Sequence, residues 1–130
     1  MNEVYEFLKK CGTYYLATAD GDQPRVRPMG TVDIFENRLY IQTGKIKNVS
    51  RQMQTNPKVE ICACIGGDWL RVAATAVRDD RTEAKQHMLD QYPQLKGRYK
   101  ADDDNTEVLY LKDATATFSS FTAEPRVIRF

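Results

Sequence analysis

Long apolar runs, abundant cysteine and an excess of charge of one sign are all missing from this sequence of 130 residues. No apolar stretch approaches the roughly 20 residues that a membrane-spanning helix needs, and residues 1–6 lack the apolar segment of a secretion signal. The 19 basic and 18 acidic residues give a net charge of +1, which excludes a general attraction to nucleic acid or anionic membranes. Any anion-binding site must therefore be local.

The three cysteines are too few, and odd in number, for a secreted protein held by disulfides. We therefore expect free thiols and a cytoplasmic location. Cys62 and Cys64 share one face of a predicted strand, but a single Cys-x-Cys pair is a poor zinc site, so we expect buried thiols and no bound metal. His87, the only histidine, has no nucleophile signature beside it and is interpreted as a partly exposed packing residue.

The length fits one domain over residues 1–130, with a substantial core and no repeat or linker. Apolar periodicity predicts helices over residues 2–11, 46–55 and 82–92, the last opened by a capping box at residues 80–83. Residues of strand type form the segments 13–19, 24–34, 39–43, 59–65, 69–77, and 107–112 with 114–121, the last two joined as one long bent strand. The form of the tail, 124–130, is left open.

Short hairpin connections join most of these six predicted strands, and helices are inserted between only some of them. A doubly wound sheet would need helices between nearly all strands. The pattern therefore predicts a mainly β fold, a small antiparallel barrel with flanking helices.

Two arginines alternate in the segment 24–30, so that Arg25 and Arg27 leave the same face of the predicted strand. Pro28 and Gly30 interrupt this strand, a pattern that often marks a bulge or the close approach of a ligand to the backbone. Arg27 is the stronger candidate because both interruptions follow it. An ordinary solvated barrel face is the alternative.

The next segment, 43–48, places a hydroxyl, two lysines and backbone N–H groups at a predicted helix start. Such a helix terminus binds phosphate readily, and its dipole disfavours Lys45 and Lys47 unless an anion compensates them. At most one of the two lysines can face the phosphate, because residues two apart point to different sides of a helix. Three further polar side chains lie within one turn: Asn48, Arg51 and Gln52.

Trp69 and Arg71 share a face of the fifth predicted strand. An indole beside a guanidinium can cover or stack with a planar ring system, although an ordinary interface aromatic explains the pair equally well. The segment 119–121, at the end of the last long strand, could likewise contact a ligand. No catalytic triad or carboxylate pair is evident, so a cofactor would carry any chemistry.

Taken in order, these pieces resemble the pyridoxamine 5′-phosphate oxidase-related family, whose fold is the FMN-binding split barrel. The resembling segments cover nearly the whole chain: residues 7–8, 15–18, 23–29, 39–44, 47–49, 52, 56–61 and 69–72. The resemblance implies a six-stranded antiparallel split β-barrel that forms a homodimer, with two FMN sites at the subunit interface.

The resemblance also implies roles for individual residues. Residues Arg27, Pro28, Met29 and Gly30 would follow the isoalloxazine and ribityl chain. Gln42 and Thr43 would contact the cofactor from the next strand. Lys47, with Lys45 and Asn48, would hold the phosphate, and Gln52 would approach the ring or the phosphate side. Trp69, Arg71 or the segment 119–121 would come from the partner subunit.

The authentic oxidase has an extended C-terminal region with Trp and Arg residues that bind flavin and the substrate phosphate. Residues 125–130 do not show that pattern, so oxidation of pyridoxamine phosphate is not expected, and the short form resembles the nitroimidazole-reductase-like branch. We expect an FMN-dependent oxidoreductase that passes electrons from a reduced nicotinamide to a small molecule. The alternative is a non-catalytic module that stores or senses flavin or haem.

Overall fold

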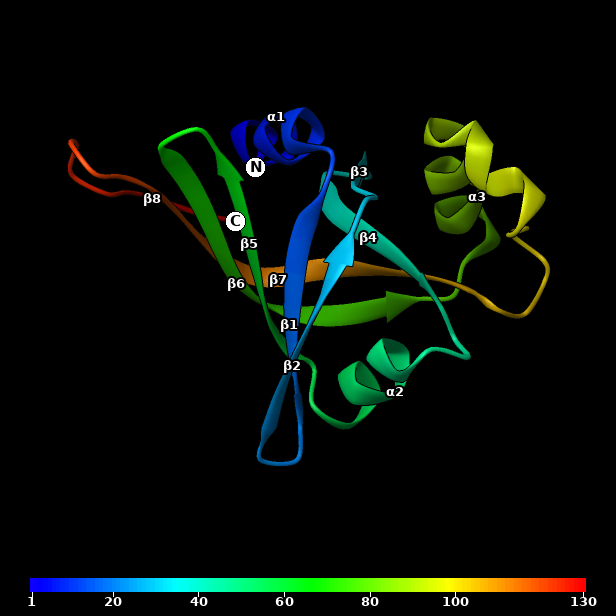
Figure 1. Cartoon of the computed structure of the whole chain (residues 1–130). Coiled ribbons are helices and arrows are strands. Elements are labelled where there is room, and N and C mark those ends of the chain that lie inside the picture. Colours follow the sequence, from blue (N-terminus) through cyan, green and yellow to red (C-terminus); the bar gives the residue numbers. More distant parts are fainter.

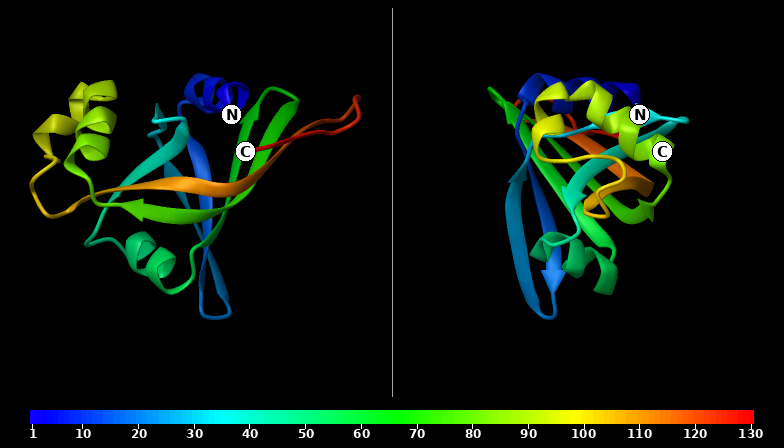
Figure 2. Two further views of the ribbon diagram at one scale, coloured as in Figure 1. Left: turned by 180° about the vertical axis from the view of Figure 1, so that it is seen from behind. Right: turned by 90° about the vertical axis from the view of Figure 1, so that its right-hand side faces the viewer.

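The computed structural model describes residues 1–130 and shows one curved antiparallel sheet with three α-helices around it (Figures 1 and 2). The sheet order is β2-β1-β5-β6-β7-β4-β3, and β8 pairs with β7. Because β2 and β3 are not paired with each other, the barrel is split rather than closed. The strands are β1 Tyr14–Asp20, β2 Gln23–Met29, β3 Asp33–Phe35, β4 Arg38–Gly44, β5 Lys58–Ile65, β6 Asp68–Asp79, β7 Thr106–Ser120 and β8 Arg126–Arg129.

The helices are α1 Asn2–Cys11, α2 Asn48–Thr55 and α3 Thr82–Gln91, the last followed by a 3-10 turn over Pro93–Gly97. In Figure 1, α1 lies above the sheet and α2 below it, whereas α3 lies to one side. Helix α2 packs on β1 and β4, and α3 packs on β3 and β7. None of the helices is both long and apolar enough to cross a membrane.

The main core consists of 20 buried apolar residues, most of them from α1, α2 and the strands of the sheet. On β5, the alternate residues Val59, Ile61 and Ala63 point inward, as the period of two requires. Helix α2 adds Val49 and Met53. Each fully buried aliphatic side chain contributes about 1.5–3 kcal/mol, so this core fixes α2 on the sheet.

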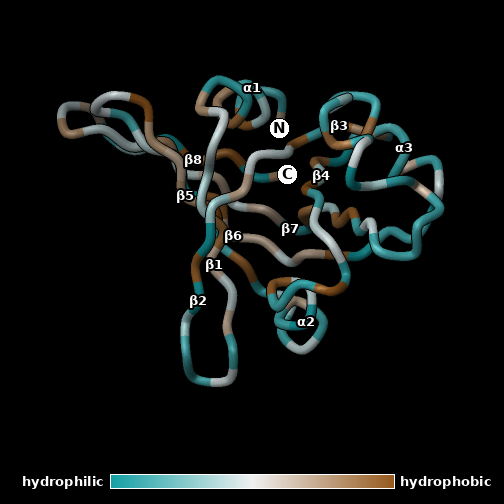
Figure 3. The backbone as a smooth tube through the Cα atoms, turned by 45° about the vertical axis from the view of Figure 1, so that its right-hand side comes forward, coloured by the Kyte–Doolittle hydropathy of each residue, from teal (hydrophilic) through white to brown (hydrophobic).

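A second, smaller cluster lies under α3, where Tyr40 and Val108 of the sheet meet Ala84, Met88 and Tyr92. Figure 3 shows the corresponding hydrophobic stretches in brown along the strands, while the loops around α3 are largely hydrophilic. The two faces of β4 thus pack in different clusters: Ile41 belongs to the main core and Tyr40 to the cluster under α3.

The fold class expected from the sequence is confirmed, with eight strands where six were expected. The segment 24–34 is two strands, because β2 ends at Met29 and β3 begins only at Asp33. The tail supplies the other addition, since Arg126–Arg129 pairs with residues 115–118 of β7. The segment 106–120 is one strand, with an irregular register against β6 opposite Ala73 and Thr75.

Two helix starts also differ from the sequence prediction. Helix α3 has no capping box: Arg81 is the N-cap and its side chain makes no capping bond. Instead, the Asp79 carboxylate accepts the Arg81 backbone N–H at 3.1 Å. Helix α2 begins at Asn48, two residues later than predicted, because a turn precedes it in which the Lys47 N–H bonds to the Gly44 carbonyl at 3.0 Å.

Candidate functional site

A cleft of about 1080 Å³ lies between β2 and α2, with the end of β4 on one side. Its lining is mostly polar, with only four hydrophobic residues among sixteen. The lining residues are Ala19, Asp20, Gly21, Arg25, Val26, Arg27, Pro28, Met29, Thr43, Lys47, Asn48, Val49, Arg51, Gln52, Thr55 and Asn56. This cleft unites the two segments, 24–30 and 43–48, that the sequence singled out.

Arg27, on β2, is fixed in the cleft wall by hydrogen bonds to two other elements, β1 and α2. Its Nη1 donates to the Leu16 carbonyl at 3.2 Å and to Thr18 Oγ1 at 2.7 Å. Its Nη2 donates to Gln52 Oε1 at 2.6 Å, and the Thr18 hydroxyl donates to the same oxygen at 2.6 Å. The half-buried guanidinium therefore connects β1, β2 and α2 in one network.

Positive charge dominates the cleft although the whole chain has a net charge of only +1. Its four cationic side chains face one acidic side chain, Asp20. That carboxylate pairs with Arg25 at 3.2 Å. Because both side chains are about half exposed, the ion pair contributes little to the stability of the fold. Burial and the neighbouring Arg25 charge lower the pKa of Arg27 below its usual value. An anion in the cleft would relieve this repulsion.

The N-terminus of α2 forms one end of the cleft. Its N-cap, Lys47, has an extended backbone and makes no side-chain capping bond, and the first turn contains no acidic residue. The first N–H groups of a helix have no intrahelical partner and carry a partial positive charge. With Lys47, Asn48 and Thr43 beside it, this terminus fits a phosphate group.

Seven of the twelve predicted cofactor residues line this cleft: Arg27, Pro28, Met29, Thr43, Lys47, Asn48 and Gln52. Two further predicted residues, Gly30 and Gln42, lie outside the lining. Gly30 follows the end of β2, close to Gly12. Gln42 is buried, and its amide donates to the Thr43 carbonyl at 3.2 Å. Both residues are therefore adjacent to lining residues and do not themselves face the cleft.

Lys45 does not line the cleft. Its ammonium is 3.6 Å from the Asp80 carboxylate and 3.7 Å from that of Asp104. Two acidic side chains from distant parts of the sequence thus draw it away from the α2 terminus. Of the two lysines, only Lys47 faces the cleft.

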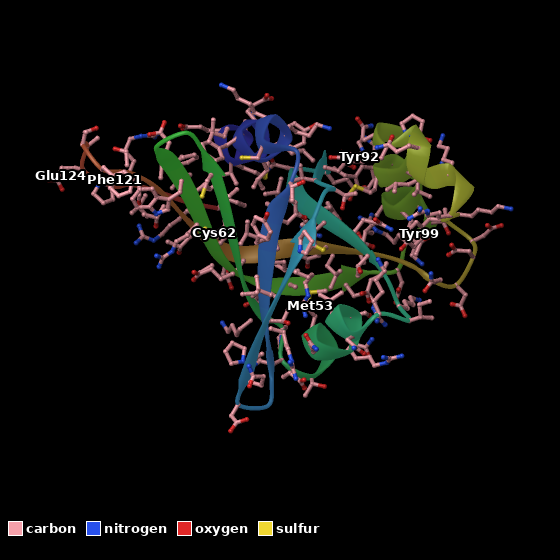
Figure 4. All side chains as sticks on the ribbon, in the orientation of Figure 1. Met53, Cys62, Tyr92, Tyr99, Phe121 and Glu124 are labelled. Carbon is pink, nitrogen blue, oxygen red and sulfur yellow. The ribbon has the colours of Figure 1, made fainter.

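Trp69 and Arg71 lie on β6, outside the cleft of the same chain. Trp69 contacts Phe121 with ring centroids 5.1 Å apart, and Arg71 pairs with Glu60 at 3.4 Å. Phe121 is 87% exposed, and Figure 4 shows it with Glu124 at the far end of the projecting β7–β8 connection. The contact of Trp69, Arg71 or the segment 119–121 with a ligand from a partner subunit therefore stays a prediction.

Two important site residues were missed from the sequence. Thr18 shares the Arg27 network, and Asp20 is the only acid in the lining. The sequence did contain a signal for Thr18, because it lies on the same strand face as Leu16. In the β1–β2 hairpin, whose turn the sequence marks, Leu16 is paired with Arg27 and Thr18 with Arg25. The contact with Gln52 could not be inferred, since α2 packs there only in the folded chain.

The predicted burial of the Cys-x-Cys pair is wrong. Cys62 is half-buried and Cys64 is exposed, because the alternate residues of β5 point into the core. Burial raises the pKa of the Cys62 thiol, and the neighbouring Cys64 adds to this effect. No group of three or more His, Cys, Asp or Glu side chains is arranged to hold a metal ion.

His87 has the packing role that its sequence context indicated. Its Nδ1 lies 2.6 Å from the Asp33 carboxylate, and its ring packs beside Phe35 at 4.8 Å between centroids. It therefore connects α3 to β3 and takes no part in the lining of the cleft.

The family follows from a comparison with known sequences. Residues 1–127 match the family described as pyridoxamine 5′-phosphate oxidase. The chain belongs to this family. The resemblance inferred from the ordered motifs is thereby confirmed. No curated protein sequence gives a significant match.

Solved structures with the same fold include a NimC/NimA family protein from Clostridium acetobutylicum, with 42% identity, a TM-score of 0.96, and coverage of 100% of this chain and 92% of that one. General Stress Protein 26 from Bacillus anthracis has 18% identity and a TM-score of 0.76, with 99% and 97% coverage. The haem storage protein HutZ from Vibrio cholerae has 17% identity and a TM-score of 0.68, with 88% and 91% coverage. The last two likenesses concern the fold alone.

Proposed function

We propose that this protein is an FMN-binding oxidoreductase that moves electrons between a reduced nicotinamide and a small molecule. The observation that carries the proposal is the cationic cleft, which has an uncapped helix terminus at one end and a strand with Arg27 at the other. A ligand with a phosphate at one end and a planar, electron-accepting ring at the other fits this distribution of charge. Membership of the family and similarity to a NimC/NimA protein support the same ligand.

The residues of the cleft divide into two groups toward such a ligand. Lys47, Asn48 and Thr43 would hold the phosphate with the N–H groups of α2, and Arg51 lies one turn further along the same helix. The β2 residues 27–29 would follow the ring. The flavin, when bound, supplies the capacity to accept a hydride. The chain supplies binding, orientation and positive charge.

We further propose a homodimer in which each copy completes the cleft of the other. The exposed apolar side chains fit an interface: Val26 in the cleft is 69% exposed, and Phe121 beside Trp69 is 87% exposed. Two-fold pairing is the commonest arrangement of soluble oligomers, and ligand sites often form between surfaces. The three free cysteines fit a reducing compartment, the cytoplasm.

The test is an absorption spectrum of the purified protein, before and after addition of FMN and then of reduced nicotinamide. We expect a bound flavin that the nicotinamide bleaches, with saturable binding. Protein that stays colourless and does not take up added FMN would refute the proposal. Light scattering at working concentration tests the dimer, which a monomeric mass would exclude.

A second candidate function is flavin storage or sensing without catalysis. The observation that favours it is the lack of a proton donor in the cleft, where the only acidic side chain, Asp20, is solvent-exposed and paired with Arg25. Bound flavin that no reduced nicotinamide bleaches would select this function. Haem storage, which the name of HutZ suggests, is less well supported, since no histidine lines the cleft and His87 is bonded to Asp33.

A further inference from the structure

Arg27 differs from most other arginines of this chain because its bonded partners are all neutral. A backbone carbonyl, a hydroxyl and an amide oxygen accept its three hydrogen bonds. Five other arginines have a carboxylate oxygen within 4 Å: Arg25, Arg71, Arg78, Arg81 and Arg126. Arg27 therefore has no carboxylate among its hydrogen-bond partners.

The neutral partners are also fixed in orientation. Gln52 Oε1 accepts from both Arg27 and Thr18, so the amide cannot turn without losing two bonds. Thr18 is only 4% exposed, and its hydroxyl both accepts from Arg27 and donates to Gln52. A half-buried cation without a counter-charge is costly. A glutamate in place of Gln52 would have the same shape and would remove that cost, yet the chain has an amide there.

We propose that Thr18 and Gln52 are positioning residues that hold Arg27 as an uncompensated cation, so that the cleft binds the hydride-reduced, more negative form of its flavin in preference to the oxidised form. This inference rests on the proposed function and adds a determinant of redox preference to it. Reduced nicotinamide gives up one hydride, which is two electrons and one proton, and becomes oxidised nicotinamide. The flavin that receives the hydride gains one unit of negative charge.

The size of the effect follows from the dimensions of the cleft. A volume of about 1080 Å³ corresponds to a width of about 10 Å, so charge on a ligand inside lies within roughly that distance of Arg27. At an effective dielectric constant of about 20, a unit charge at about 10 Å changes an equilibrium by about tenfold. For a two-electron couple this factor corresponds to about 30 mV.

The decisive substitution is Gln52→Glu. The carboxylate keeps an acceptor oxygen for Arg27 and Thr18 and adds the counter-charge that Arg27 lacks. The matched control is Gln54→Glu, which makes the same change on the same helix at a residue that is bonded to Ser50 and does not line the cleft. For each variant, the dissociation constants of oxidised and reduced FMN are measured anaerobically, together with the potential of the bound flavin.

We expect Gln52→Glu to lower the preference for reduced over oxidised FMN by about tenfold or more relative to Gln54→Glu, a fall of about 30 mV or more in the potential. The phosphate has the same charge in both redox states, so a general loss of phosphate binding cancels in this ratio. Arg27→Gln should shift the ratio in the same direction. A purely structural role of Gln52 would leave the ratio unchanged.

Two failures are distinguishable. If the unmodified protein does not bind FMN, the proposed function fails, and this inference fails with it. If FMN binds and is reduced, but Gln52→Glu and Arg27→Gln both match Gln54→Glu in the ratio, only the inference about Arg27 is overturned. Should Gln52→Glu fold poorly, two other single variants test the inference. Arg27→Gln removes the fixed cation, and Thr18→Val removes one of the groups that hold it.

Discussion

Replacing Lys47 by alanine should weaken FMN binding strongly, whereas replacing Lys45 should not. Lys47 lines the cleft at the N-terminus of α2, and a hydrogen bond to a charged group is worth about 1.5–3 kcal/mol. We therefore expect the dissociation constant to rise about 10- to 150-fold in Lys47→Ala. Lys45 faces Asp80 and Asp104 instead, so Lys45→Ala should change FMN binding by less than about twofold.

The assay is a titration of FMN fluorescence quenching with each variant, at two salt concentrations. Because Lys45→Ala removes the same charge two residues away, the comparison separates a contact in the cleft from a change in net charge. The affinity of the Lys47→Ala variant should also depend less on salt than that of the unmodified protein. Equal losses in the two variants, or a larger loss in Lys45→Ala, would refute the placement of the phosphate at α2.

Three further outcomes follow from the structure. Ile61→Ala, in the main core, should lower the free energy of unfolding by about 2–5 kcal/mol in a urea titration. Hydrogen bonds from Arg81 lower the pKa of Asp79 from 3.8 to about 2. This carboxylate therefore adds about 2 kcal/mol to the free energy of unfolding, fully present above about pH 4 and lost as the pH falls through about 2. In Asp79→Asn, the free energy of unfolding measured between about pH 4 and about pH 2 should lack this part of its decrease. Phe121→Ser should weaken the proposed dimer in sedimentation equilibrium without lowering the melting temperature of the monomer, because that side chain is 87% exposed.

Much of the fold could be predicted because local patterns and tertiary packing agree. The alternation of Val59, Ile61 and Ala63 predicted β5, and the same alternation places Cys62 and Cys64 on the outer face. The expectation of buried thiols gave more weight to the usual burial of cysteine than to this pattern. The tail could not be assigned because β8 has only four residues and depends on pairing with the preceding strand, β7.

The candidate site was predictable where it depends on local geometry. Alternation on one strand singled out Arg25 and Arg27, and the predicted helix start singled out Lys45 and Lys47. The choice between Lys45 and Lys47 depends on Asp80 and Asp104, which are distant in the sequence. The support of Arg27 by Thr18 depends likewise on the position of α2 in the folded chain, and no local pattern contains that information.

The two end strands of the main sheet order, β2 and β3, are poorly suited to pairing with a strand from another molecule. β2 is an edge strand, and Pro24 and Pro28 within it have no N–H group to donate. The opposite edge, β3, is only three residues long. Both edges are therefore poor templates for a strand from another molecule. Growth of the sheet by strand addition at β2 or β3 is thereby disfavoured, and the proposed dimer would use side-chain contacts rather than strand pairing at these two edges.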